Sequence, residues 1–303
     1  MKYSLKKKRS KMIYILPISI IAGCIIVSLV VMNAFGFGKS GSDQHTADSN
    51  SVTTESGSDN VTTTEQETET TAPQSEHTNP KDAKAAEELE KSSENRVYLT
   101  FDDGPSSNTD EILDILKKNN IKATFFVIKR DDPESIARLK RIYDEGHTVA
   151  LHTVSHDYPL VYADMDSYKK DVDGIKSFVD STLGINCKFY RFPGGSSNTI
   201  YKHYGIKDIH ECIDYLNSIG VEYFDWNISN SDSEGKKYTP EQLAENVETY
   251  IGDTGVYNIL QHDAPAKKNT VKSLQLIIDN LKAKGYTFCQ ITDNTKPVHH
   301  HIS

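Results

Sequence analysis

Residues 96–105, Arg-Val-Tyr-Leu-Thr-Phe-Asp-Asp-Gly-Pro, join a strand pattern to two adjacent carboxylates. Apolar residues alternate up to Phe101 as in a β-strand, and the Gly-Pro pair predicts a turn directly after it. At a strand end that enters a turn, Asp102 and Asp103 can both reach one cleft, although neighbours on a strand point to opposite faces. One carboxylate can then bind a cation while the other handles a proton. Asp-Asp-Gly alone is more often a solvated turn, so the interpretation depends on the rest of the chain.

A pair of histidines follows further along, in His152-Thr153-Val154-Ser155-His156. Histidines at this spacing lie on one face of a helical turn, so both rings are expected to converge on one ion. Two imidazoles and one carboxylate form a common ligand set for a hydrolytic metal, with other positions left to water or substrate. The nearby His147 begins an apolar run and is expected to serve packing.

Three more motifs complete the pattern: Arg191-Phe192-Pro193-Gly194-Gly195, Phe224-Asp225-Trp226 and Ile259-Leu260-Gln261-His262-Asp263. Each one follows or closes a short apolar run. Taken in order, the five motifs resemble the carbohydrate esterase family four, the polysaccharide deacetylases of the NodB-homology type. The resemblance covers residues 95–291.

The resemblance implies a role for each motif residue. Asp103, His152 and His156 would form the metal triad. Asp102 would be the general base that activates the attacking water, and His262 the general acid that protonates the leaving nitrogen.

The remaining motif residues would support this centre. Arg191 would orient the base, and Asp225 would tune either the Arg191 end or the His262 end of the site. The family commonly has Tyr after Arg-x-Pro, where its backbone N–H binds the oxyanion. The residue here is Gly194, which keeps the N–H but supplies no ring. Trp226 either lines the substrate groove or packs under the sheet.

The chemistry of amide hydrolysis agrees with this set. A bound metal lowers the pKa of water to about 7, and a metal and a backbone N–H can share the oxyanion. An amine leaves poorly unless it is protonated, and a His, which titrates near neutrality, suits that task. Zinc fits a mixture of His and carboxylate ligands, and cobalt or nickel could also fit.

Strand and helix patterns alternate through the second part of the chain. Strands are expected near 96–101, 123–128, 148–151, 188–192, 222–225, 256–260 and 286–291, and helices lie between them, for instance at 110–119, from Thr239-Pro240 onward and at 270–284. This alternation predicts an α/β fold, a distorted (β/α) barrel of about seven parallel strands. The motif residues fall at or just past the C-terminal ends of the strands, where barrel enzymes place their sites.

The N-terminal part predicts a membrane anchor and a tether. A basic tail (1–12) precedes an uncharged apolar run (13–37) that can supply the roughly 20 residues needed to cross a bilayer, with the catalytic part outside the cell. A cleaved signal peptide and a lipoprotein signal ending at Cys24 are the alternatives. Residues 38–94, rich in Ser, Thr and Glu, are expected to be a disordered linker with a short helix near 81–91. Residues 95–291 would be the catalytic domain, and 292–303 a C-terminal tail with solvated histidines at 299–301.

The net charge excludes one class of partner, and the cysteine content bears on the core. The formal net charge is −9, and the acidic catalytic part offers no surface for nucleic acid. Cys187, Cys212 and Cys289 are expected to be buried, with one disulfide among them as the alternative. We expect a single-pass membrane protein that is a monomer and whose partner is an acetylated polysaccharide.

Three functions are compatible with these observations. The leading prediction is removal of N-acetyl groups from an amino-sugar polymer, peptidoglycan or a chitin-like oligomer. An O-acetyl esterase acting on xylan or another glycan is the first alternative, and a catalytically silent glycan-binding wall protein is the second. The complete set of motif residues argues against a silent protein.

Overall fold

The computed structural model of the chain describes residues 80–302. The predicted basic tail, apolar anchor and most of the linker lie outside the described residues. Within residues 80–302, no helix is long and apolar enough to cross a membrane.

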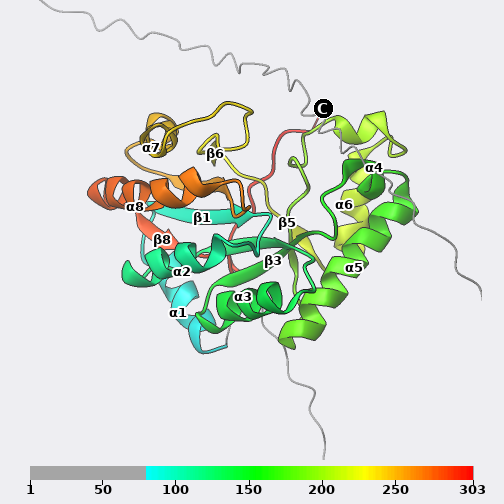
Figure 1. The fold of residues 1–303 in the computed structure, drawn as a ribbon, viewed down its shortest axis with the longest axis horizontal. Helices are drawn as coiled ribbons and strands as arrows, with labels where there is room; N and C mark the ends of the chain where they lie inside the picture. Colours follow the sequence, from blue (N-terminus) through cyan, green and yellow to red (C-terminus); the bar gives the residue numbers. More distant parts are fainter. Residues whose placement is uncertain (1–79, 303) are drawn as a thin grey trace, which may run out of the picture. The chain divides into compact units, whose positions relative to one another are not determined.

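A single parallel sheet forms the centre of this part of the chain (Figure 1). Its strands are β1 (Arg96–Asp102), β2 (Thr124–Ile128), β3 (Thr148–Thr153), β4 (Phe189–Tyr190), β5 (Glu222–Tyr223), β6 (Ile228–Ser229), β7 (Val256–His262) and β8 (Thr287–Cys289). The order is β5-β4-β3-β2-β1-β7-β6, and β8 pairs with the N-terminal half of β1. The sheet therefore curls into a barrel that stays open between β5 and β6. This confirms the predicted α/β fold, although β6 was not expected.

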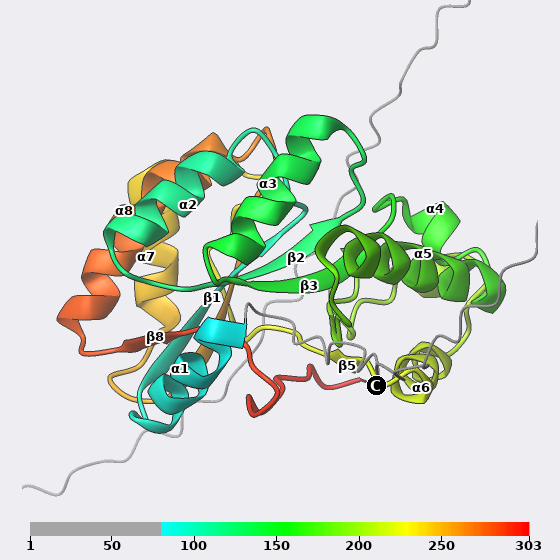
Figure 2. The same cartoon turned by 90° about the horizontal axis from the view of Figure 1, so that it is seen from below.

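Helices connect the strands and cover the outer face of the sheet. They are α1 (Pro80–Lys91), α2 (Thr109–Lys118), α3 (Pro133–Asp144), α4 (Tyr158–Val161), α5 (Met165–Leu183), α6 (Ile209–Ser218), α7 (Pro240–Tyr250) and α8 (Lys268–Ala283), with a short 3-10 helix at Ile200–His203. Figure 2 shows α2, α3 and α5 along one outer face of the strands. The predicted start of α7 is confirmed, because Thr239 and Gln242 form a reciprocal capping box.

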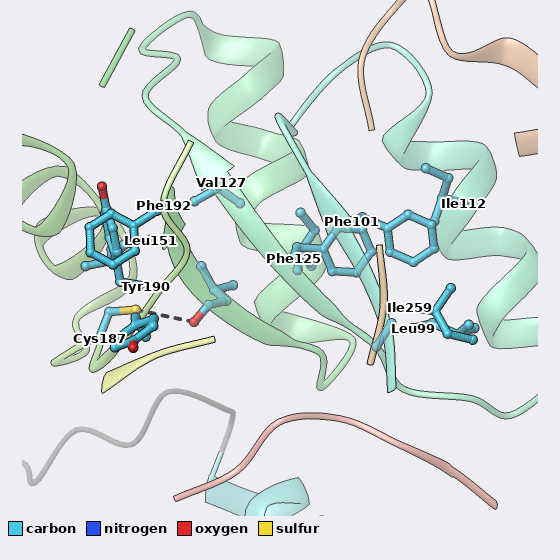
Figure 3. Close-up of a cluster of buried hydrophobic side chains, with 14 of the residues drawn as sticks. Leu99, Phe101, Ile112, Phe125, Val127, Leu151, Cys187, Tyr190, Phe192 and Ile259 are labelled. Atoms are coloured by element: carbon cyan, nitrogen blue, oxygen red, sulfur yellow. Dashed lines mark hydrogen bonds between the residues drawn. The ribbon is translucent and has the colours of Figure 1, made fainter. Parts of the chain in front are cut away.

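The core has two layers separated by the sheet. Leu99 and Phe101 of β1 belong to the larger layer, beneath the helices, where the Phe101 ring stacks on Phe125 at 5.1 Å (Figure 3). Tyr98 points to the other side and joins the smaller layer inside the barrel, together with Phe126. Because helices and the barrel interior cover both faces, β1 is buried throughout from Val97 to Asp102.

The three cysteines in the described residues are free and buried. Cys187 donates its thiol hydrogen to the carbonyl of Val149 at 3.3 Å. His147 is buried too and accepts the Ala123 N–H at 3.0 Å, so its predicted packing role is confirmed.

Segments on both sides of the predicted domain belong to the same packed unit. Glu90 of α1 is buried, and its carboxylate accepts hydrogen bonds from Tyr98 at 2.8 Å, Thr292 at 2.8 Å and Thr295 at 2.9 Å. The His299 ring stacks on Tyr223 with 3.9 Å between ring centroids. The folded unit thus extends beyond residues 95 and 291. His299 and His301 are exposed, as predicted for a solvated tail, but the His299 ring contacts Tyr223 of β5 and His300 is only partly exposed.

Candidate active site

The motif residues gather at the C-terminal edge of the sheet. Asp102 is the last residue of β1 and His262 the last of β7, and the parallel register places these two opposite each other. His152 lies at the end of β3, and Arg191 follows β4. Strand ends alone therefore bring residues from distant motifs together, as expected for this fold.

The carboxylates of Asp102 and Asp103 point in different directions because the backbone changes conformation at Asp103. Asp103 has φ of 73°, in the left-handed region that non-glycine residues rarely adopt. This turn sends the Asp103 carboxylate toward His152 and His156, whereas Asp102 faces Arg191. Both reach one site, as predicted, and they face different partners.

Asp103, His152 and His156 meet in a cluster with the character of a cation site. Their ligand atoms lie within 4.8 Å of one another, and each histidine Nε2 is 3.6 Å from Asp103 Oδ1. That oxygen is buried and has no hydrogen-bond partner, an arrangement that costs free energy unless a cation compensates it. The residues present thus fit a divalent metal.

The protonation of His152 suits a metal ligand. Its Nδ1 lies 2.7 Å from the Arg191 carbonyl oxygen, which can only accept, so Nδ1 carries the hydrogen and Nε2 is free to coordinate. Burial, with the neighbouring His156, lowers the pKa of His152 to about 3 and keeps the ring neutral.

The two histidines converge for a reason other than the predicted one. His152 belongs to β3, and His156 lies in the following loop with φ of 55°, so no helical turn is involved. The loop is fixed by Asp171 of α5, a residue outside every sequence motif. Its carboxylate accepts a hydrogen bond from Thr153 Oγ1 at 2.7 Å and from the Val154 N–H at 3.2 Å.

Arg191 fixes the position of Asp102. The guanidinium is fully buried, and its Nη1 donates to Asp102 Oδ1 at 2.7 Å and to Thr100 Oγ1 at 2.8 Å. Its Nε donates to the Phe224 carbonyl at 2.8 Å. Burial raises the pKa of Asp102, and the charge of Arg191 opposes that rise. The carboxylate is therefore held in one orientation while remaining more basic than a solvated Asp.

His262 pairs with Asp232, a residue the sequence analysis did not identify. His262 Nδ1 lies 2.6 Å from Asp232 Oδ1, and the His262 backbone N–H donates to Oδ2 at 3.0 Å. Burial alone would favour the neutral ring, but the charge and hydrogen bond of Asp232 outweigh it and raise the pKa of His262 to about 9. Asp232 follows β6, whose two residues are too few to show a strand pattern.

Asp225 lies at the Arg191 end of the site. Its carboxylate accepts hydrogen bonds from the Ser196 N–H at 2.9 Å and from the His300 N–H at 2.8 Å, while its carbonyl accepts from Arg191 Nη2 at 3.1 Å. The alternative at the His262 end is wrong, because Asp232 occupies that position.

Gly194 and Trp226 border the site. Gly194 has φ of 78°, and a Cβ there would lie 3.0 Å from the Tyr158 hydroxyl, so the space next to Gly194 is taken by a ring from α4. The Tyr158 ring also packs edge-on against His156, with 5.4 Å between centroids. Trp226 is partly exposed and its ring lies 5.7 Å from the Arg191 guanidinium, which favours a position lining the groove over packing under the sheet.

Several known proteins resemble this chain in sequence and in fold. Residues 90–220 match the family described as "Polysaccharide deacetylase". The chain is 35% identical over 207 residues to a putative polysaccharide deacetylase, YheN, of Bacillus subtilis, a match that covers 67% of this chain and 69% of that protein. It is 32% identical to a bifunctional xylanase/deacetylase of Pseudobutyrivibrio xylanivorans over 65% of this chain, but only 30% of that protein's length is covered.

Among solved structures, the catalytic domain of a peptidoglycan N-acetylglucosamine deacetylase from Eubacterium rectale superposes with a TM-score of 0.66. It is 35% identical, and the match covers 70% of this chain and 95% of that one.

Proposed function

Because the chain belongs to the polysaccharide deacetylase family, we propose that it is a metal-dependent hydrolase that removes N-acetyl groups from the amino sugars of cell-wall peptidoglycan. The Eubacterium rectale relative is a peptidoglycan N-acetylglucosamine deacetylase, and the match covers 95% of its catalytic domain. The partner is accordingly an acetylated polysaccharide.

Asp103, His152 and His156 would hold the metal, with zinc the best match to one carboxylate and two imidazoles. A divalent cation supplies Lewis-acid polarisation of water and of the acetyl carbonyl. The N–H of Gly194 would donate to the oxyanion that develops on that carbonyl.

Asp102 is the proposed base. Its carboxylate lies beside the metal ligands and is held by Arg191 at 2.7 Å. It would take the proton of the attacking water, and the salt bridge keeps it from rotating away. A fixed and partly desolvated carboxylate is a better base than one in solvent.

His262 is the proposed acid, and its pairing with Asp232 is the observation that carries this function. With a pKa of about 9, the ring holds its proton at neutral pH. Nδ1 is engaged by Asp232, so the proton that can be transferred sits on Nε2. An amine must be protonated to leave, and a charged imidazolium opposite Asp102 in the strand register meets that need.

O-acetyl ester hydrolysis is the second candidate. The same base and oxyanion donors would cleave an ester, and the bifunctional xylanase/deacetylase relative is the observation that favours it. An ester places less demand on the acid because an alkoxide is a better leaving group than an amide anion. The two activities can therefore be separated through His262.

The test compares His262→Ala on two substrates in the metal-loaded full-length protein. On an N-acetylglucosamine oligomer, kcat/KM should fall by about 10²–10⁴-fold, whereas an aryl acetate, whose phenolate leaves unaided, should be spared. His210→Ala is the matched control, because His210 pairs with Asp208 at 2.7 Å on the exposed surface. Equal loss on both substrates would show that His262 is not the acid. Acetylated xylan as the better wild-type substrate would favour the esterase.

We also propose that the apolar run at residues 13–37 anchors the protein in the cell membrane, with the hydrolase facing the cell wall. The basic residues before this run and the uncharged residues within it support this orientation. The polar linker would give the catalytic part the reach to meet a wall polymer.

A further inference from the structure

The C-terminal segment Val298–His300 lies along the open edge of the sheet, next to the active site. The Asp225 N–H donates to the Val298 carbonyl at 2.7 Å, and His299 Nε2 lies 3.0 Å from the Tyr223 carbonyl. Figures 1 and 2 both show the red C-terminal segment passing beside β5. The segment therefore covers the edge strand from which Asp225 and Trp226 continue.

His300 makes several contacts there. Its backbone N–H donates to Asp225 Oδ2 at 2.8 Å, and its ring packs edge-on against Trp226 with 4.7 Å between centroids. Nε2 lies 2.7 Å from the Trp226 carbonyl, so it donates, and Nδ1 then accepts from Ser197 Oγ at 3.1 Å. The ring and backbone of His300 thus hold both residues that follow β5.

The space around the indole is narrow. A Cβ at Gly195 would lie 2.8 Å from Trp226 Cη2 and 3.2 Å from His300 Nδ1, so only glycine allows the three to pack this closely. The Arg191 guanidinium lies 5.7 Å from the indole ring. Trp226 nevertheless remains partly exposed. Its orientation is set by its neighbours while part of its surface stays open to a ligand.

We propose that the segment Val298–His300 is part of the glycan-binding site, with His300 as a positioning residue that fixes Trp226 as a stacking surface for a sugar ring of the polymer. The inference rests on the proposed function, since it assigns the substrate a second contact beside the reacting acetamide. An aromatic ring offers a sugar a large, rigid apolar surface, and fixing it in advance removes the cost of ordering it on binding.

The proposal predicts a change in KM more than in kcat. Without the His300 ring, the Trp226 side chain must be immobilised each time the glycan binds. This loss of side-chain entropy corresponds to about a 3–10-fold rise in KM for an N-acetylglucosamine tetramer. The kcat should stay within about twofold, because His300 does not touch Asp102 or His262. An aryl acetate has no second sugar, so its kinetics should not change.

Trp226 is the single tryptophan of the chain, so its fluorescence reports the contact directly. In the metal-loaded full-length protein, His300→Ala should shift the emission to longer wavelength and increase quenching by acrylamide. His300→Gln, whose amide N–H can reach the same carbonyl, should restore KM and emission toward wild type. The adjacent, exposed His301→Ala is the matched control and should behave as wild type.

The outcomes separate this inference from the proposed function. Unchanged emission and KM in His300→Ala would overturn it, and so would an emission shift with KM unchanged, since the segment would then be structural only. If the tetramer altered wild-type emission but not that of His300→Ala, the inference would hold even if no acetate were released. A wild-type protein that neither released acetate nor responded to the tetramer would refute both.

Discussion

Replacing Asp232 with Asn removes the negative charge that keeps the His262 ring protonated, while leaving a side chain of the same size. The wild-type ring has a pKa of about 9, against an ordinary value of 6.5. Without the charge, the pKa of His262 should fall to about its ordinary value, because the charges of Asp103 and Asp102 still oppose the effect of burial. The acid would then lose its proton within the neutral range, and activity should become sensitive to pH where the wild type is not.

The size of the effect follows from the two pKa values. At pH 8, a ring with a pKa of about 9 is about nine-tenths protonated, whereas one with a pKa of 6.5 is about 3% protonated. Asp232→Asn should therefore lose about 30-fold in kcat/KM on an N-acetylglucosamine oligomer at pH 8 and less than about twofold at pH 6. Hydrolysis of an aryl acetate, which needs no acid, should not show this difference.

The assay is acetate release between pH 6 and pH 9, with metal content verified in each sample. Asp225→Asn is the control, because Asp225 is another buried carboxylate of the site and its partners are Ser196 and His300. A loss in Asp232→Asn that is equally large at pH 6 and pH 8 would refute the reasoning, since Asp232 would then act on the fold and not on the proton.

The pair also makes stability depend on pH. Because the folded-state pKa of His262 is raised, its contribution is complete below about pH 6.5 and is lost as the pH rises through about 9. Thermal unfolding of the wild type should show this loss across that range. Asp232→Asn should lack it.

Further expectations concern the metal, the buried Glu90 and the membrane. Replacing His152 or His156 with Ala should abolish stoichiometric metal binding, as measured by elemental analysis. His156→Ala is the cleaner variant, because His152 is buried in β3 and its loss also affects the core. Full retention of metal in both variants would contradict the triad. Glu90→Ala should lower the free energy of unfolding by about 2–4 kcal/mol in urea titrations, because three buried hydroxyl groups lose their acceptor, whereas the exposed Glu88→Ala should have almost no effect. The full-length protein should remain in the membrane fraction. A shortened form in the medium would indicate signal cleavage. Fatty-acid labelling that disappears in Cys24→Ala would indicate a lipoprotein.

Much of the fold follows from short-range patterns. The strand at residues 96–102 shows in the alternation that ends at two carboxylates, and the start of α7 shows in its capping residues. The candidate metal triad follows from an ordered set of motifs, although the helical turn expected for His152 and His156 is wrong. A strand end followed by a left-handed residue brings the rings together as well as a helical turn would.

The residues that the sequence analysis missed lie where no pattern exists. Asp232 follows a strand of two residues, and Asp171 occupies an ordinary position on the long helix α5. The polar C-terminal histidines suggested solvent, yet His300 packs on Trp226. In each case the role depends on a partner distant in the sequence, and the residue type alone does not identify that partner.

The sequence by itself determined the alternation of strands and helices, the family resemblance and the candidate metal triad, because strand periodicity, capping residues and short motifs act over a few neighbouring positions. Only the tertiary structure decided that Asp232 and not Asp225 pairs with His262, that Glu90 of α1 joins β1 to the C-terminal segment, and that this segment reaches the site. Those contacts join residues from different loops. The parallel strands and the open edge at β5 bring the loops together, and the free energy of such a contact depends on burial that arises only when the chain has folded.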